Sequence, residues 1–144
     1  MKISAVGLDL IKEFEKLRLK AYFPTVNDVP TIGYGHTRGV KIGDVCTKEQ
    51  ADKWLLEDVA DAEGCIQRLV RQPLNQNMYD ALCSFIFNLG CFNFSTSTML
   101  KMINARDYVS AAKQFARWNK QGQVVLNGLV TRRAKEAVLF SQGE

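Results

Sequence analysis

Glu15 is the first residue of this sequence whose surroundings suit a proton donor. It lies near the expected C-terminal end of a helix, one position beside the apolar stripe of that helix. The helix dipole and the apolar neighbours both favour the neutral form of a carboxyl group there. A carboxylic acid that stays protonated near neutral pH can donate its proton to a leaving oxygen. Glu15 is therefore a candidate general acid, although the pattern also fits a surface glutamate that pairs with Lys12 or Arg18.

A glycine-rich stretch, "TIGYGHT" at residues 31–37, follows this glutamate closely. Its two glycines fall in a predicted strand and turn, where the missing side chains allow a ligand to approach the backbone. Taken alone, the stretch is explained equally well as a tight β-turn. A helix end that leads into a short hairpin can place Glu15 and the glycine-rich stretch on the same cleft. The short separation of the two in sequence therefore favours a shared site.

Several motifs along the chain occur in an order that is typical of one protein family. They are "FEKLRLKAY" and "PTIGYGHT" near the N-terminus, "PLNQNMYDALCSFIFNLG" in the middle, "STSTMLKMIN" after it, and "GLVTRRAKEAVLF" near the end. In this order, and over nearly the whole chain, they resemble the phage-type lysozymes, the muramidase endolysins that cut bacterial peptidoglycan. The resemblance implies an α+β, mainly helical, lysozyme-like fold. A small N-terminal lobe with a short β-hairpin would be joined by a long helix to an all-helical C-terminal lobe.

The resemblance also implies roles for individual residues. Glu15 matches the general acid of the family, and Thr31 matches a threonine that positions a water or stabilises the sugar intermediate. The family usually has an aspartate, or sometimes a cysteine, nine residues after the glutamate, but Pro24 stands there in this chain. The loop "YFPTVNDVPT" is one residue longer than the usual form, so alignment backwards from Thr31 places Thr25 there instead.

Asp28 is the only acid in this loop. Hydrolysis of a glycosidic bond ordinarily uses two carboxylates, one to protonate the leaving group and one to activate water or stabilise the sugar cation. Asp28 would supply the second carboxylate if the longer loop folds it towards the cleft. The alternative is a turn residue whose side chain satisfies backbone donors. Both interpretations stay open.

His36, the only histidine, invites assignment as a base, but the corresponding histidine of the family is structural. Asp58 matches its ionic partner. The helical pattern agrees, because Asp58 shares a row with Leu55 and Ala62, where an unpaired carboxylate is costly. We therefore expect His36 and Asp58 to tie the cores of the lobes together rather than to catalyse.

Further residues match the family by position. Phe87 and Asn88 correspond to residues that line the cleft from the larger lobe, although Phe87 is otherwise simply a core residue. Arg133 corresponds to a structural basic residue that reaches towards the catalytic glutamate, or else it shares a solvated face with Arg132 and Lys135. The resemblance implies that the sugar is bound by residues of both lobes, namely Gly35, Thr37, Phe87, Asn88 and, by position only, Gln114.

The elements that must position these residues can be outlined from pattern. Apolar residues recur at helical steps over residues 3–17, which predicts a first helix with Ser4 as its N-cap candidate. Prolines and glycines in residues 18–44 rule out a long helix and favour short strands, the only β region expected. A capping-box signature at Thr47 opens a long helix that ends before Pro73. An apolar central helix ends at Gly90. Shorter helices are expected at residues 96–104, 108–118 and 130–141.

This outline predicts one lysozyme domain in three parts. Residues 1–47 form the N-terminal lobe, residues 48–72 the connecting helix and residues 73–144 the helical C-terminal lobe. The 144 residues are 47% hydrophobic and 24% charged, which is enough for one sizeable core. The N-terminus lacks an apolar run of signal-peptide length, and no membrane span is expected. Four cysteines without paired spacing are expected to be reduced thiols, which favours a cytoplasmic folding compartment.

The formal net charge of +4 favours a polyanionic target without choosing among nucleic acid, membrane and cell-wall polymer. Nucleic-acid binding through "VTRRAKEAV" is a weakly supported alternative, because no base-reading motif accompanies its three basic residues. The expected function is hydrolysis of the β-1,4 bond between N-acetylmuramic acid and N-acetylglucosamine by a host-lysing endolysin. Lytic transglycosylation by Glu15 alone and murein binding without cleavage remain alternatives.

No metal and no cofactor are expected. The resemblance further implies a monomer that neither binds nucleic acid nor inserts into a membrane. It would accumulate in the host cytoplasm and depend on a holin for access to the wall.

Overall fold

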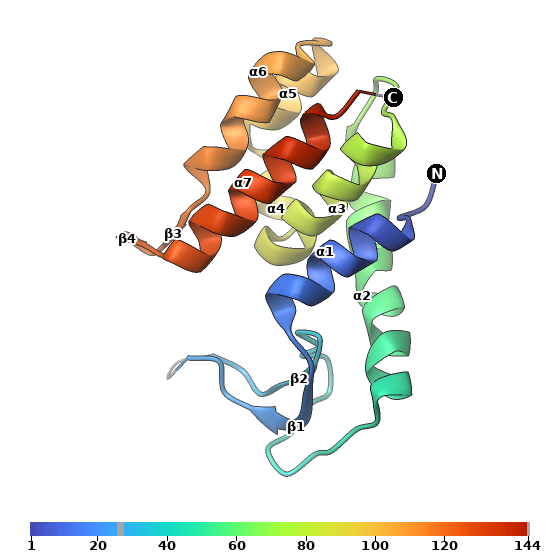
Figure 1. Cartoon of the computed structure of the whole chain (residues 1–144), viewed down its shortest axis with the longest axis vertical. Coiled ribbons are helices and arrows are strands. Elements are labelled where there is room, and N and C mark those ends of the chain that lie inside the picture. Colours follow the sequence, from blue (N-terminus) through green and yellow to red (C-terminus); the bar gives the residue numbers. More distant parts are fainter. Residues whose placement is uncertain (26–27, 144) are drawn as a thin grey trace. The chain divides into compact units, whose positions relative to one another are not determined.

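The computed structural model describes residues 1–25 and 28–143. The chain forms two compact units. The small unit is Asp9–Ala60, and the large unit comprises Met1–Leu8 and Asp61–Glu144. Their boundaries fall inside two helices, α1 at Ala5–Glu15 and α2 at Lys48–Leu69 (Figure 1).

The small unit contains a β-hairpin between the end of α1 and the start of α2. Strand β1 at Arg18–Tyr22 pairs antiparallel with β2 at Thr31–Gly33, with Arg18 opposite Gly33 and Tyr22 opposite Thr31. Lys12 of α1 pairs with Asp52 of α2 at 3.2 Å. The hairpin and both helix segments therefore form one structural body within residues 9–60.

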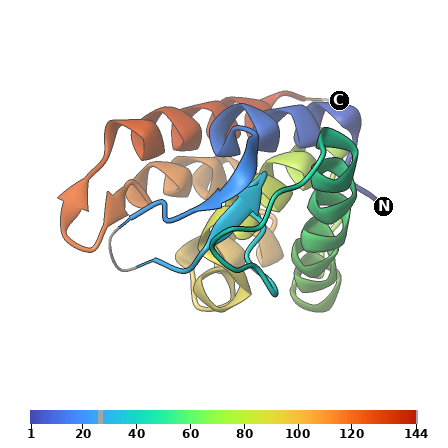
Figure 2. The ribbon, with the colours of Figure 1, turned by 90° about the horizontal axis from the view of Figure 1, so that it is seen from below.

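The large unit is built from helices around an apolar core. They are α3 at Gln76–Leu89, α4 at Cys91–Ser95, α5 at Thr98–Asn104, α6 at Tyr108–Gln114, a 3-10 turn η1 at Phe115–Arg117, and α7 at Asn127–Ser141. Helix α3 packs against α7, and α6 and α7 lie side by side in both views (Figures 1 and 2). The centre of this core is aromatic, since the rings of Phe94, Phe115 and Trp118 meet the ring of Phe85 edge to face.

Local sequence signals explain several helix ends. The Thr47 hydroxyl accepts a hydrogen bond from the Gln50 amide, as the predicted capping box requires. The Asn75 side chain caps α3 by accepting from the Met78 amide. Gly90 ends α3 with a φ of 88°, a conformation that favours glycine. The predicted start of α2 and end of α3 are confirmed.

The start of α1 is held by long-range bonds. The Ile3 amide donates to Glu63, and the Ser4 amide donates to Asp80, at 2.8 and 2.9 Å. Ser4 does precede the helix, but its hydroxyl donates to Asp80. The contacts explain why Met1–Leu8 belongs to the large unit, whereas the sequence predicts a continuous lobe over residues 1–47.

A second hairpin was not expected from the sequence. Strand β3 at Lys120–Gln121 pairs with β4 at Val124–Val125 across a two-residue turn. Gly122 in this turn has a φ of 62°. The prediction that residues 18–44 hold all the β-structure is therefore wrong. Strands of two residues are too short to show an alternating pattern, and Gly122 was the only available signal.

The prediction that all the cysteines are reduced thiols is wrong for two of the four. Cys65 of α2 and Cys91 of α4 form a disulfide, whereas all four cysteines were expected to be reduced. Cys46 and Cys83 are free thiols. The two cysteines are 26 residues apart and form no sequence motif, so only the fold brings their sulfurs together. Within the described residues, no helix is both long and apolar enough to cross a membrane.

Candidate active site

Glu15 is the last residue of α1 and is half-buried. The helix ends there because Lys16 adopts the left-handed conformation, with a φ of 58°. The Lys16 amide still bonds to the Lys12 carbonyl at 3.0 Å, which closes the last turn. Glu15 is thus placed at the helix C-terminus, as the sequence predicts, three residues before β1 begins at Arg18.

The "TIGYGHT" stretch forms a strand end and a tight turn. Ile32 and His36 exchange backbone hydrogen bonds of 2.9 and 2.8 Å around a three-residue loop. Gly33 and Gly35 within it have φ values of 65° and 80°. A Cβ on Gly33 would lie 3.2 Å from the Ala51 Cβ. At Gly33 the missing side chain therefore serves close packing against α2 and backbone conformation.

Thr31 is buried, with 5% of its surface exposed. Its hydroxyl donates a hydrogen bond of 3.0 Å to the Val29 carbonyl. Because a hydroxyl has a single proton, Thr31 Oγ1 can then act towards another group only as an acceptor. A water that donates a hydrogen to Oγ1 keeps its own lone pairs available for attack.

Asp28 lies exposed in the loop between Tyr22 and Thr31. Its Oδ1 accepts from the Val29 amide at 2.9 Å, and its own amide donates to the Thr25 carbonyl at 3.2 Å. These are the local bonds of a turn residue. Pro24 and Thr25, at the position where the family's aspartate is expected, are exposed as well.

His36 is held between two side chains of α2. Its Nδ1 lies 2.8 Å from the Asp58 Oδ2, and its ring stacks on Trp54 with the centroids 4.5 Å apart. His36 and Asp58 are therefore in contact, as the sequence predicts. Both lie in the small unit, however, so the pair joins the hairpin to α2 and does not tie two lobe cores together. Trp54 was not predicted to take part.

A buried charged cluster in the large unit involves Arg133. Its Nη1 lies 2.5 Å from the Glu136 Oε1, and its Nη2 donates to the Asn88 Oδ1. Arg132 lies 3.3 Å from the other Glu136 oxygen, which also accepts from the Ser84 hydroxyl. Burial raises the pKa of Glu136, while Arg133 and Arg132 act to lower it. The predicted alternative of a solvated face is wrong for both arginines, since each is at least 95% buried.

The remaining candidates lie at helix ends of the large unit. Phe87 and Asn88 are half-buried near the C-terminus of α3, and Gln114 is half-buried at the end of α6. Phe87 is not among the described residues that form the apolar core, and whether it lines the cleft or serves packing stays a prediction. Gly35 and Thr37 of the small unit are half-buried and exposed, respectively. The candidates thus form two groups, one in each unit.

Sequence reasoning missed two features of the large unit. Glu136 follows Arg132 and Arg133 at helical steps of four and three in "RRAKE", and this spacing could have revealed the ion pairs. The disulfide had no comparable signal. Among the described residues, no group of three or more His, Cys, Asp and Glu side chains could hold a metal ion.

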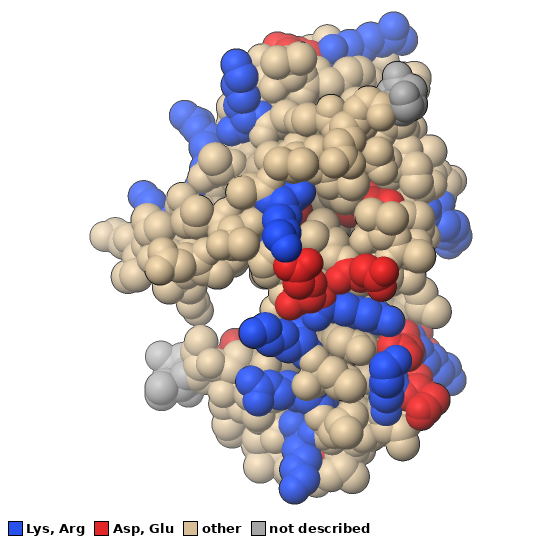
Figure 3. Space-filling model, viewed as in Figure 1, with Lys and Arg blue, Asp and Glu red and all other residues tan. Residues whose placement is uncertain are grey.

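Charged side chains do not gather into one basic patch on the face shown in Figure 3. Lys and Arg appear there in several places, with Asp and Glu between them. This distribution lacks the continuous basic stripe that is typical of nucleic-acid-binding surfaces.

Comparisons with known proteins agree with one another. The family model described as phage lysozyme matches residues 12–136. An endolysin of Acyrthosiphon pisum secondary endosymbiont phage 1 is 46% identical, over 97% of this chain and 98% of the relative. The crystal structure of a P22 lysozyme mutant superposes with a TM-score of 0.87 at 42% identity, over 99% of both chains. The muramidase domain of SpmX from Asticaccaulis excentricus superposes with a TM-score of 0.92 at 39% identity, again over 99% of both chains.

The fold and these relatives define a glycoside hydrolase of the lysozyme type. The chain belongs to the phage lysozyme family. The predicted lysozyme-like fold class, enzyme class and endolysin function are confirmed.

Proposed function

We propose that this endolysin hydrolyses the β-1,4 bond between N-acetylmuramic acid and N-acetylglucosamine, with Glu15 as the general acid. The observation that carries the proposal is the place of Glu15, half-buried at the end of α1 in the unit that also holds Thr31. Glu15 protonates the glycosidic oxygen as the bond to the leaving sugar breaks.

Thr31 is proposed to position the attacking water. Its hydroxyl proton is engaged by the Val29 carbonyl, so Oγ1 accepts a hydrogen from the water and leaves the water's lone pairs facing the sugar. The turn bonds of Asp28 favour a structural role for that residue. The assignment of Asp28 as the second catalytic carboxylate is therefore kept as the weaker proposal, to be tested beside Thr31.

The glycan is proposed to contact Gly35 and Thr37 of the small unit and Phe87, Asn88 and Gln114 of the large unit. The half-buried state of Phe87, apart from the apolar core, supports a role in binding. Asn88 offers its amide hydrogens as donors, because its carbonyl oxygen is engaged by Arg133. We propose a structural role for Arg133, which holds Asn88 in this orientation.

The route to the wall is also a proposal. The chain would act as a monomer that accumulates in the host cytoplasm and reaches peptidoglycan after a holin opens the membrane. This rests on its kinship to endolysins. Because Cys65 and Cys91 form a disulfide, the cysteines give no support for a cytoplasmic folding compartment.

Digestion of purified murein by wild type and variants, with the products weighed, tests the chemistry. Glu15→Gln is expected to lose about 10²–10⁴-fold in rate, the usual contribution of general acid catalysis. Glu13→Gln, an exposed glutamate on the same helix, is the matched control. Thr31→Val should lose activity while Asp28→Asn keeps most of it. Lysis retained by a folded Glu15→Gln variant would rule out the mechanism.

The masses of the products separate the alternatives. Hydrolysis adds one water to each broken bond, whereas transglycosylation by Glu15 as both acid and base gives anhydro-sugars that are lighter by one water. A protein that binds murein would sediment with it and release no fragments. Neither alternative is favoured by the relatives, which are endolysins and a muramidase domain.

A further inference from the structure

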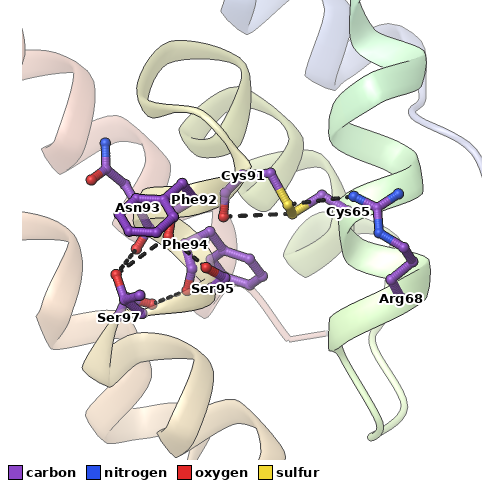
Figure 4. Close-up of a disulfide and its surroundings, with 9 residues drawn as sticks. Cys65, Arg68, Cys91, Phe92, Asn93, Phe94, Ser95 and Ser97 are labelled. Carbon is purple, nitrogen blue, oxygen red and sulfur yellow. Dashed lines mark hydrogen bonds between the residues drawn. A yellow bond between two sulfur atoms is a disulfide. The ribbon is translucent and has the colours of Figure 1, made fainter.

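The Cys65–Cys91 disulfide ties the long helix α2 to the short helix α4 inside the large unit (Figure 4). Its two sulfurs differ in access. Cys65 is fully buried among the apolar residues of the core, while Cys91 is half-buried at the start of α4. Of the two cysteines, Cys91 is therefore the more accessible from solution.

Arg68 adds a positive charge on the accessible side. Its guanidinium Nη2 lies 3.6 Å from the Cys91 Sγ, and Figure 4 shows the guanidinium beside the disulfide. Gly64, one turn earlier on α2, makes room for this position, because a Cβ there would lie 3.3 Å from the Arg68 Nη1. In the reduced protein, a cation beside Cys91 favours its thiolate, the reactive form of cysteine.

We propose that Cys91 is a thiol–disulfide exchange site, at which a small disulfide oxidant of the glutathione type closes the Cys65–Cys91 bond. The Cys91 thiolate attacks one sulfur of the oxidant and forms a mixed disulfide with it, and the other sulfur of the oxidant leaves as a thiolate. Cys65 then loses its proton and attacks the Cys91 sulfur, and the second half of the oxidant leaves as a thiolate. Two cysteines are oxidised, one disulfide oxidant is reduced to two thiols, and the protons pass to those thiols.

Burial of Cys65 makes the closed bond resistant to mild reductants. An external thiolate can attack only at Cys91, so Cys65 would have to leave as a thiolate inside the apolar core, where a charge is unfavourable. Cys65 then stays beside the mixed disulfide and can displace the reagent again. The dithiol would persist in a reducing compartment and close in an oxidising one. Its closing on release from the cytoplasm rests on the proposed function.

The first test maps the initial adduct. The reduced, folded full chain with Cys46→Ser is treated with oxidised glutathione, quenched with acid and analysed by peptide mass spectrometry. Adding Cys65→Ser should trap glutathione on Cys91, while adding Cys91→Ser should leave Cys65 unmodified. Cys83, which is buried and outside the pair, is the internal control and should stay unmodified in both. An adduct on Cys65, or none on Cys91, overturns the proposal.

The second test concerns Arg68. Arg68→Met keeps the aliphatic stem and removes the charge, so adduct formation on Cys91 should slow by roughly threefold or more at pH 7. The difference should disappear above about pH 9.5, where thiolate forms without help. A purely structural effect of Arg68 would not depend on pH in this way. Equal rates at both pH values overturn the role of the guanidinium at this site.

The third test measures what the bond does. Closing a loop of this length should raise the midpoint of thermal unfolding by about 10 °C over the reduced protein. Cys65→Ser should melt at the same temperature with and without reductant. Equal melting of oxidised and reduced wild type, or four free thiols in protein isolated without reductant, contradicts the proposal. None of these readouts depends on lysis, so they stand apart from the proposed function.

Discussion

The Nδ1 of His36 lies 2.8 Å from the Oδ2 of Asp58, and the same imidazole stacks on Trp54. The ring planes of His36 and Trp54 differ by only 7°. The only histidine of the chain is thus packed between two side chains of α2, and 7% of its surface is exposed. This arrangement anchors the tight turn that follows β2 to helix α2.

Asp58→Asn should weaken this anchor. The change removes the carboxylate that faces His36 and should lower the free energy of unfolding at pH 7 by about 1–3 kcal/mol. Glu57→Gln, an exposed neighbour on α2, is the control and should change it by about 0.5 kcal/mol or less. Urea unfolding followed by Trp fluorescence measures both. Equal stability of the two variants would show that the pair does not hold the hairpin.

Gly33→Ala should destabilise the hairpin more than Gly39→Ala. Both glycines have a positive φ, 65° and 72°, so both variants strain the backbone by about 1 kcal/mol or more. Only Gly33 faces a neighbour, the Ala51 Cβ at 3.2 Å, whereas a Cβ on Gly39 meets open space. The excess loss in Gly33→Ala therefore measures crowding against α2. Chemical denaturation of the two variants compares them, and identical losses would leave conformation alone as the reason for Gly33.

Gly7→Ala should destabilise the large unit although alanine is the better helix former. A Cβ on Gly7 would lie 2.9 Å from the Asp80 Cβ, and Asp80 is held there by its bonds to Ser4. The loss should be about 1–3 kcal/mol, the usual effect of overpacking. Gly128→Ala, in α7 with nothing within 4 Å, should instead gain up to about 1 kcal/mol. Thermal unfolding of both variants gives the sign, and a stabilised Gly7→Ala would contradict this packing.

The protein should lose stability in alkali through Cys83. Burial raises the pKa of this thiol from its ordinary value of 9.0. Above pH 9 the unfolded chain releases the proton while the folded chain keeps it, so stability falls as pH rises. The slope from one such group is about 1.4 kcal/mol per pH unit. Cys83→Ala should reduce this slope between pH 9 and 11. Cys46→Ala, at a half-buried thiol, is the control with a smaller effect.

Much of the small unit could be predicted from the sequence. Glu15 stands at the end of α1, and the glycines of "TIGYGHT" make a tight turn, because helical periodicity and glycine conformation act over a few residues. The capping box at Thr47 is likewise a local interaction. The motif order pointed to the lysozyme fold. Asp28 remained open at this level, since a loop aspartate can turn the backbone or face a substrate.

The contacts that only the tertiary structure decided join residues that are far apart in the chain. Asp80 holds the start of α1 from 76 positions away, and Ser84 and Asn88 meet the charges of α7 across the large unit. The Cys65–Cys91 bond spans 26 positions without a motif. The sequence by itself determined which chemical groups the chain carries and the local conformations that present Glu15 and Thr31. Packing decided which charges are buried in pairs and which sulfurs meet, because these contacts depend on helices that are brought together by the core rather than by neighbouring residues.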